Sequence, residues 1–164
     1  MTLYHGSSTM VSIPNLDLSR KNLDFGTGFY TTENKEQAAD FAEKVMLRKG
    51  QHSQSVSVYD FDMEKGVSVL TILKFSTPDK EWLNFVHQNR HGIYTGKCYD
   101  LIFGPVANDD VFATLLIYEQ GILNTEQTLE ALKIKKLYSQ YVFKTEKALS
   151  LLTHIESFDP REKL

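Results

Sequence analysis

Short segments with the periodicity of strands and segments with the periodicity of helices follow one another along this chain without regular alternation. Alternating or β-branched apolar residues predict strands at 2–5, 29–32, 56–61, 67–75, 99–103 and 141–143, with a turn at 64–66. Apolar residues at helical spacing predict helices after residues 34, 77, 110 and 124, and a last helical turn at 147–152. A doubly wound parallel sheet needs strict strand–helix repetition, so this order predicts an α+β fold with mainly antiparallel sheet.

Several of the predicted helices begin with recognisable caps. Asn34 with Gln37, and Asn124 with Gln127, have the spacing of a capping box. Thr77 precedes a proline, which favours the first position of a helix. The buried face of the helix after Asn34 is expected to consist of Ala38, Phe41, Ala42, Val45 and Met46.

Chain length and composition limit the number of domains and the kinds of cross-link. The 164 residues suit one domain, which we place at residues 1–155, followed by a polar tail at 156–164. The single cysteine, Cys98, excludes an internal disulfide and any multi-cysteine zinc site. A net charge of −3 disfavours binding to nucleic acid through overall positive charge, although a local basic patch is compatible with it.

The chain carries no pattern of a membrane protein or a secreted protein. No apolar stretch approaches the roughly 20 residues of a membrane span. The first residues have neither a basic start nor an apolar signal region. We therefore expect a cytoplasmic protein without a membrane partner.

Three segments combine residue types that serve chemistry. The first is Tyr4-His5-Gly6-Ser7, the second is Gly26-Thr27-Gly28-Phe29-Tyr30, and the third is Gln140-Tyr141-Val142-Phe143. Histidine offers a ring nitrogen for hydrogen bonds, and glycine lets a ligand approach the backbone closely. Taken alone, the first and third segments are more typical of ordinary strand residues, and the second fits a hairpin turn with core aromatics as well as it fits a site.

Taken together, the three segments resemble the ADP-ribosyltransferase superfamily, on the His-Tyr-Glu branch that includes diphtheria toxin and the poly(ADP-ribose) polymerases. More closely, the chain resembles a bacterial family of unknown function that groups with this superfamily. That resemblance covers most of residues 2 to 152. It implies split antiparallel sheets around an NAD cleft, with helices outside, and NAD as substrate rather than a metal cofactor.

The resemblance also implies roles for individual residues. His5 would bind a ribose hydroxyl of NAD, the backbone of Gly6 would hold the nicotinamide carboxamide, and Tyr30 would stack on the nicotinamide ring. Ser7 and Gly28 complete the implied binding residues. The catalytic set implied in this way is His5, Tyr30 and Gln140.

Gln140 departs from the superfamily pattern, which has a glutamate at this place. An amide can bind a ribose hydroxyl, but it lacks the charge that stabilises an oxocarbenium ion and it cannot accept a proton. Another carboxylate could replace it, and Asp109, Asp110 and Glu146 are the candidates. For the group Asn108-Asp109-Asp110, a helix cap is an alternative interpretation.

The resemblance implies an NAD-dependent mono-ADP-ribosyltransferase acting on a protein or nucleic-acid acceptor. A toxin or phage-defence role, with an antitoxin as partner, is expected at the level of the superfamily. Two alternatives stay open because of Gln140. They are a non-catalytic module that binds NAD or ADP-ribose, and an NAD glycohydrolase whose acceptor is water.

Two further patterns have a functional and a structural interpretation. His87 and His91 are four residues apart and share a helix face, but no third ligand accompanies them at a recognised spacing, so no metal site is expected. Lysines gather near the third segment and form either a solvated surface or a basic rim for a nucleic-acid acceptor. These lysines are Lys133, Lys135, Lys136, Lys144 and Lys147.

Overall fold

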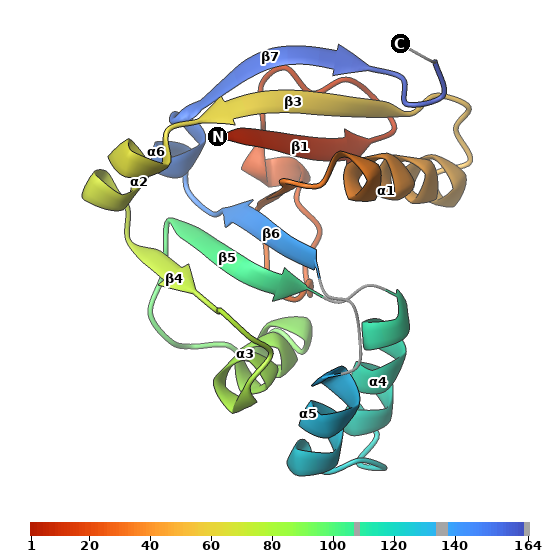
Figure 1. Ribbon diagram of the computed structural model, residues 1–164, viewed down its shortest axis with the longest axis vertical. Coiled ribbons are helices and arrows are strands. Elements are labelled where there is room, and N and C mark those ends of the chain that lie inside the picture. The colour runs from red at the N-terminus through yellow and green to blue at the C-terminus, as the bar shows by residue number, and fades with distance from the viewer. Residues whose placement is uncertain (107–108, 134–137, 163–164) are drawn as a thin grey trace.

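A computed structural model describes residues 1–106, 109–133 and 138–162 and arranges their strands in one seven-stranded sheet (Figure 1). The strand order is β4-β5-β6-β2-β1-β3-β7, and all neighbours are antiparallel except β4 and β5. The strands are β1 (Thr2–Ser7), β2 (Phe29–Thr32), β3 (Ser55–Phe61), β4 (Ile72–Lys74), β5 (Leu101–Val106), β6 (Tyr138–Phe143) and β7 (Leu152–Phe158). The α+β fold with mainly antiparallel strands is therefore confirmed.

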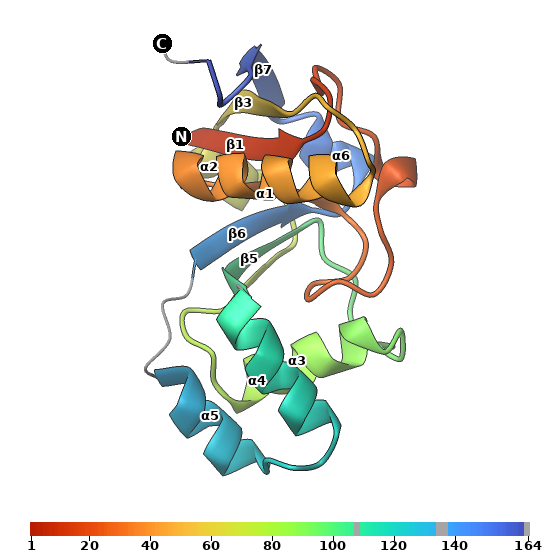
Figure 2. The same ribbon diagram turned by 90° about the vertical axis from the view of Figure 1, so that its right-hand side faces the viewer.

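Helices surround this sheet on several sides (Figures 1 and 2). They are α1 (Lys35–Arg48), α2 (Met63–Val69), α3 (Lys80–Arg90), α4 (Asp109–Glu119), α5 (Thr125–Lys133) and α6 (Glu146–Leu149), with a 3₁₀ turn at Leu16–Leu18. Among the described helices, none has the length and apolar character needed to cross a lipid bilayer.

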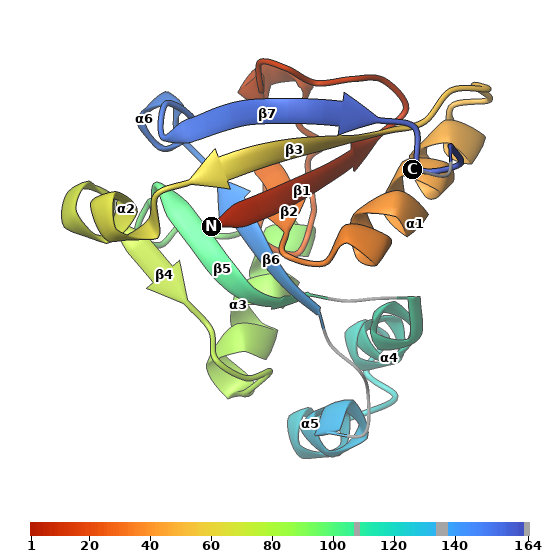
Figure 3. The same ribbon diagram turned by 45° about the horizontal axis from the view of Figure 1, so that its top comes forward.

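The sheet narrows where β1 meets β2. There Tyr4 and Thr32 are paired, whereas β1 pairs with β3 along its whole length. Strands β1, β3 and β7 form one group and β2, β4, β5 and β6 another, and the two groups run in different directions (Figure 3). The described strands thus form one hydrogen-bonded sheet with a narrow junction, where the resemblance implied two separate sheets.

Helix α1 packs on one face of β1 and β3. Ala38 and Ala42 are buried against Val56, and Asn34 caps the helix by accepting a hydrogen bond from the Gln37 N–H at 2.9 Å. The prediction for Phe41 is wrong, because its side chain is 41% exposed. Small alanines let the helix backbone approach the sheet, so the neighbouring ring is turned outward.

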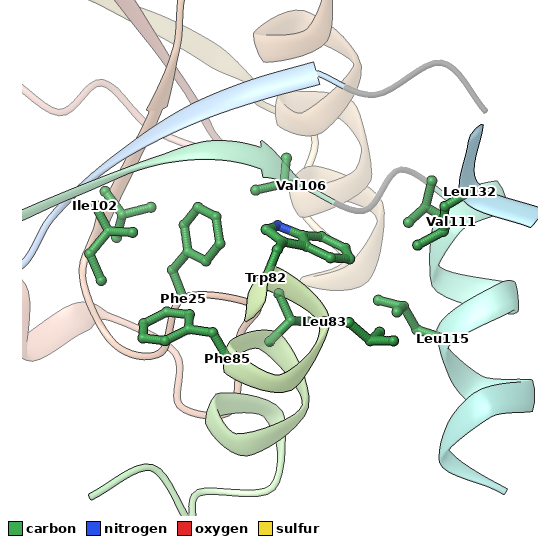
Figure 4. Packing of buried hydrophobic residues seen from close by; sticks show 11 residues of the cluster. Phe25, Trp82, Leu83, Phe85, Ile102, Val106, Val111, Leu115 and Leu132 are labelled. Carbon is green, nitrogen blue, oxygen red and sulfur yellow. The ribbon is translucent and has the colours of Figure 1, made fainter. Parts of the chain in front are cut away.

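Trp82 is at the centre of a core between the sheet and helices α3, α4 and α5 (Figure 4). The indole N–H of Trp82 donates to the carbonyl of Pro105 at 2.7 Å, so this buried polar atom is satisfied. Phe25, Phe85 and Ile102 lie on one side of the indole, and Val111, Leu115 and Leu132 lie on the other (Figure 4).

A second core fills the opposite face of the sheet. Its largest members are Leu3, Phe29, Tyr59, Phe61, Leu101, Tyr141 and Phe143. Residues of α2, α6 and the loop after β1 pack against it, among them Met63, Leu149 and Val11. Strand alternation assigns successive residues of β2 and β6 to the two cores.

The predicted strand at 67–75 is wrong over its first half. Asp62 accepts a hydrogen bond from the Lys65 N–H at 3.0 Å and begins helix α2, which includes the predicted turn. A Cβ on Gly66 would lie 2.7 Å from the Phe61 ring, so a glycine allows the close packing of this helix. Val67 is 64% exposed in this helix, so its β-branched side chain does not mark a buried strand.

Other element boundaries also differ from the sequence prediction. Asp79 caps α3 by accepting from the Trp82 N–H at 2.9 Å, in place of Thr77. The chain leaves α6 after Leu149 and forms β7, which pairs with β3 and continues to Phe158 within the segment assigned to the tail. The capping box of Asn124 and Gln127 is confirmed by reciprocal hydrogen bonds of 3.0 and 2.9 Å.

The packing of α1 on β1 predicts that Gly6→Ala is strongly destabilising. An added Cβ would lie 2.0 Å from the Ala38 carbonyl oxygen and 2.8 Å from the Ala42 nitrogen, and both are backbone atoms that cannot rotate away. We expect the free energy of unfolding, measured by urea denaturation, to fall by at least about 2 kcal/mol. Thr2→Ala, at an exposed position of the same strand, is the control, and a similar loss there would contradict the packing argument.

Candidate functional site

The three segments singled out in the sequence lie on three adjacent strands. Segment 4–7 is in β1, segment 26–30 leads into β2, and segment 140–143 is in β6. Thr32 is paired with Tyr4 on one side and with Gln140 on the other. The fold therefore brings together residues that are more than a hundred positions apart.

His5 lies at the narrow junction between β1 and β2. Its Nδ1 is 2.7 Å from the carbonyl oxygen of Tyr30, and its ring stacks on Phe29 with centroids 4.3 Å apart. Burial lowers the pKa of His5 more than the hydrogen bond to the backbone raises it. A neutral imidazole whose Nδ1–H donates to a carbonyl has Nε2 as an acceptor, so His5 can accept a hydrogen bond from a hydroxyl.

Gly6 and Ser7 follow His5 at the end of β1. Gly6 is paired with Val56 and faces α1, where a side chain would collide with the helix backbone. Ser7 is half-buried and is paired with Ser55. The glycine is therefore required for helix packing, whatever contact its backbone makes with a ligand.

The glycine-rich turn before β2 is held by side chains on both sides. Gly26 has a φ of 73°, a left-handed conformation that favours glycine. The Ser19 hydroxyl contacts both backbone groups of Gly28. It is 2.7 Å from the Gly28 nitrogen and donates to the Gly28 carbonyl at 2.9 Å. A Cβ on Gly28 would lie 2.5 Å from Val142 of β6. The turn is thus packed directly on the strand that carries the third segment.

Tyr30 fastens this turn through its hydroxyl group. The hydroxyl donates to the Gly26 carbonyl at 2.6 Å and accepts from the Phe25 N–H at 3.2 Å. Burial, with a smaller contribution from Asp24, raises the pKa of Tyr30 well above its usual value. The phenol is therefore a neutral structural anchor, and its ring packs against the core around Trp82.

Gln140 is half-buried in β6, opposite Thr32 on one side and Gly104 of β5 on the other. Strand alternation places Gln140 and Tyr30 on the face of the sheet that includes Val142. The ring of His5 contacts Phe29, which belongs to the core of the other face. The structure thus joins the three segments through the strands, with Tyr30 and Gln140 on one face and His5 on the other.

A hollow of about 290 Å³ lies on the face of β6 that is opposite the Gln140 side chain. Among its lining residues are both chain neighbours of Gln140, Ser139 and Tyr141, together with Lys74 and Glu33. The Tyr141 hydroxyl donates to the Glu33 carboxylate at 2.8 Å, and burial raises the pKa of Tyr141. Sequence reasoning missed Glu33, although it directly follows the segment Tyr30-Thr31-Thr32.

Of the carboxylates that the sequence offered in place of the missing glutamate, the one whose side chain is described, Glu146, does not line this hollow. Glu146 is exposed in the first turn of α6, beyond the end of β6 that is remote from Gln140. Asp109 and Asp110 begin α4, and their side chains lie outside the described part, as does Asn108. Asp100 accepts from the Thr71 N–H at 2.8 Å, which agrees with a role in orienting the backbone.

Each of the three described lysines near the third segment has an acceptor or an acidic side chain close by. Lys144 donates to the Phe25 carbonyl, Lys133 pairs with Glu130 at 2.6 Å, and Lys147 lies 3.9 Å from Asp100. Lys135 and Lys136 lie outside the described residues. Burial lowers the pKa of Lys144 to about 8, so this lysine supports the glycine-rich turn rather than a solvated surface.

The Tyr30 anchor predicts that Tyr30→Phe destabilises the protein. Removing the hydroxyl deprives the Gly26 carbonyl and the Phe25 N–H of their partner. We expect the free energy of unfolding to fall by about 1–2 kcal/mol in urea denaturation. Tyr4→Phe on the neighbouring strand is the control, and equal losses in the two variants would contradict the anchor.

The environment of Lys144 predicts a dependence of stability on pH. Its pKa is about 8 in the folded protein and 10.5 without perturbation, so the unfolded chain binds more protons between these values. The contribution of Lys144 to the free energy of unfolding should therefore rise from pH 8 to pH 10. Urea denaturation across this range should give a steeper rise for the wild type than for Lys144→Met. Parallel profiles would show that the lysine is not buried as described.

Comparison with known proteins identifies a family for this chain. No curated protein and no solved structure matches the chain significantly. A family model matches residues 1–154, which include all three segments and the first six strands. The chain therefore belongs to the family described as "Protein of unknown function (DUF3990)".

Proposed function

We propose that this protein is an NAD-dependent mono-ADP-ribosyltransferase. The observation that carries the proposal is the adjacency of β1, β2 and β6, because these strands hold the three segments that resemble the superfamily. The adjacency brings the three segments to one region of the sheet, although the His5 side chain lies on the opposite face from those of Tyr30 and Gln140. The resemblance and the topology are independent arguments, since neither the order nor the pairing of strands follows from the motifs.

The narrow junction between β1 and β2 is the proposed location of the NAD cleft. The strands part on either side of the pair Tyr4–Thr32, and His5 follows directly. The neutral His5 would accept a hydrogen bond from a ribose hydroxyl at Nε2, while Nδ1 stays bound to the Tyr30 carbonyl. Fixing the ribose in this way lowers the barrier to loss of nicotinamide by positioning the reacting carbon.

The proposed reaction breaks the bond between the ribose anomeric carbon and the nicotinamide nitrogen. Positive charge develops on the ribose, and an acceptor then attacks the anomeric carbon and loses a proton. Gln140 can hold a hydroxyl but cannot take that proton. Glu33 lines a hollow together with Tyr141, which belongs to the same core as the Phe29 ring on which His5 stacks, so we propose Glu33 as the carboxylate that acts as base.

The neutral Gln140 also supports a second candidate, a module that binds NAD without turning it over. An NAD glycohydrolase is the third, with water as acceptor. The choice between a protein and a nucleic-acid acceptor, the toxin or phage-defence role and an antitoxin partner stay predictions of the resemblance.

The test is to incubate the purified chain with NAD labelled in its ADP-ribose part, with and without a cell lysate. A transferase releases nicotinamide and labels a macromolecule, which protease or nuclease treatment then identifies. Release of free ADP-ribose without a labelled macromolecule would favour the glycohydrolase. Saturable binding without release would favour the binding module, and the absence of both binding and release would overturn the proposal.

Single substitutions in the same assay test the proposed role of each residue. His5→Ala should lower nicotinamide release at least about tenfold, through loss of one hydrogen bond to the substrate. Glu33→Gln should lower transfer by about 10²-fold or more as a lost base, while it keeps an acceptor for Tyr141. Gln140→Glu should raise nicotinamide release, because a carboxylate stabilises the positive ribose. His52→Ala, at an exposed histidine before β3, is the matched control and should be unchanged.

A further inference from the structure

Two histidines and a glutamate lie together where α3 and α4 end. His87 and His91 are one helical turn apart at the end of α3, with ring centroids 4.3 Å apart, and Glu119 is the last residue of α4. One nitrogen of each imidazole and one carboxylate oxygen of Glu119 all lie within 4.8 Å of one another. The sequence pattern of His87 and His91 lacked a third ligand, and the fold supplies it from a residue 28 positions further on.

His87 is the strongest indication that a ligand belongs here. Its Nδ1 is buried and has no hydrogen-bond partner among the described residues. Buried polar atoms nearly always have a partner, so an unpaired imidazole nitrogen inside a group of ligand atoms needs an explanation. A bound metal ion would provide the missing partner.

His91 is already oriented as metal-binding histidines are. Its Nδ1 lies 2.8 Å from the carbonyl oxygen of His87 and donates to it. A neutral imidazole held in this way has an unprotonated Nε2, which is the form that binds a metal. His91 is exposed at the C-terminal cap of α3, so its ring can adjust.

Glu119 is held by Arg90, which lies between two carboxylates. The Nε of Arg90 donates to Glu119 at 2.8 Å, and its Nη1 lies 3.1 Å from Asp24. These three side chains carry a net charge of −1, which favours a cation nearby. A hydrogen bond to one carboxylate oxygen orients the group and leaves the other oxygen for a metal.

We propose that His87, His91 and Glu119 bind a divalent transition metal ion, with Zn²⁺ as the best chemical match. Two imidazoles and one carboxylate are a ligand set that zinc favours, with a fourth position for water or another ligand. Tetrahedral zinc with bonds of about 2.0–2.1 Å places its ligand atoms about 3.4 Å apart. A separation of at most 4.8 Å therefore closes with a small movement, which the exposed His91 side chain can make most easily.

The metal would connect the end of α3 to the end of α4. Both helices enclose the core around Trp82, and Arg90 links the same place to Asp24 before the glycine-rich turn. Binding to the folded chain alone raises its stability in proportion to the logarithm of the free metal concentration. The proposal is independent of the NAD reaction, since it needs none of its residues.

The test is titration of the chelator-treated full chain with Co²⁺, followed by visible absorption, and with Zn²⁺, followed by calorimetry. We expect one ion per chain, the intense visible bands of tetrahedral Co²⁺, and displacement of Co²⁺ by Zn²⁺. His91→Ala and Glu119→Gln should each weaken binding at least about tenfold. His52→Ala should bind as the wild type does, and Zn²⁺ should raise the unfolding temperature of the wild type but not of His91→Ala.

Glu119→Gln keeps a group that accepts from Arg90, and His91 is exposed, so both variants should fold without metal. Circular dichroism and thermal unfolding in the presence of chelator check this. Binding of less than one ion per chain, or equal binding by the wild type and His91→Ala, would overturn the proposal. Loss of binding in His52→Ala would assign the metal to another place and overturn it as well.

Discussion

The four-residue strand β2 joins the two parts of the sheet, and Thr32 is its critical residue. The Thr32 backbone is paired with Tyr4 of β1 and with Gln140 of β6. Its hydroxyl lies 3.1 Å from the Ser139 carbonyl and 2.6 Å from the Gln37 side chain, and it accepts from the Asn34 N–H at 3.1 Å. One side chain thus connects the junction of the sheet to the start of α1. The adjacency of the three candidate segments depends on this connection.

The glycines at this junction allow the backbone to pack closely on neighbouring elements. Gly6 lets the backbone of α1 lie against β1, and Gly28 lets the turn lie against Val142. Tyr30 and Lys144 then fix the turn from two directions, through Gly26 and Phe25 respectively. A ligand would therefore meet a preformed backbone, which reduces the entropy that binding has to overcome.

Among the described residues, charged side chains contribute to the arrangement of the site at three places. Lys144 is largely buried and donates to a carbonyl, and this burial explains its lowered pKa. Arg90 lies between Asp24 and Glu119, so the turn before β2 is tied to both α3 and α4. At the hollow lined by Tyr141, Glu33 provides a negative charge and accepts a hydrogen bond from the Tyr141 hydroxyl. The candidate NAD site and the proposed metal site are thus connected to the same turn by ion pairs and hydrogen bonds.

The sequence by itself determined the features that depend on neighbouring residues. The capping box of Asn124 with Gln127, the cap by Asn34, the strand at 29–32 and the mixed α+β class follow from local hydrogen bonds and hydrophobic periodicity. The sequence prediction failed at two places, once because a local helix cap was missed and once because packing overrode the hydrophobic pattern. The β-branched Val67 lies in α2 because Asp62 caps a helix there, and Phe41 is exposed because alanines form the contact of α1 with the sheet. Only the tertiary structure decided that Glu33 and Tyr141 line one hollow, that His5 and Tyr30 occupy opposite faces, and that Glu119 joins His87 and His91. These relations depend on strand pairing and helix packing between distant segments, which no local pattern of residues specifies.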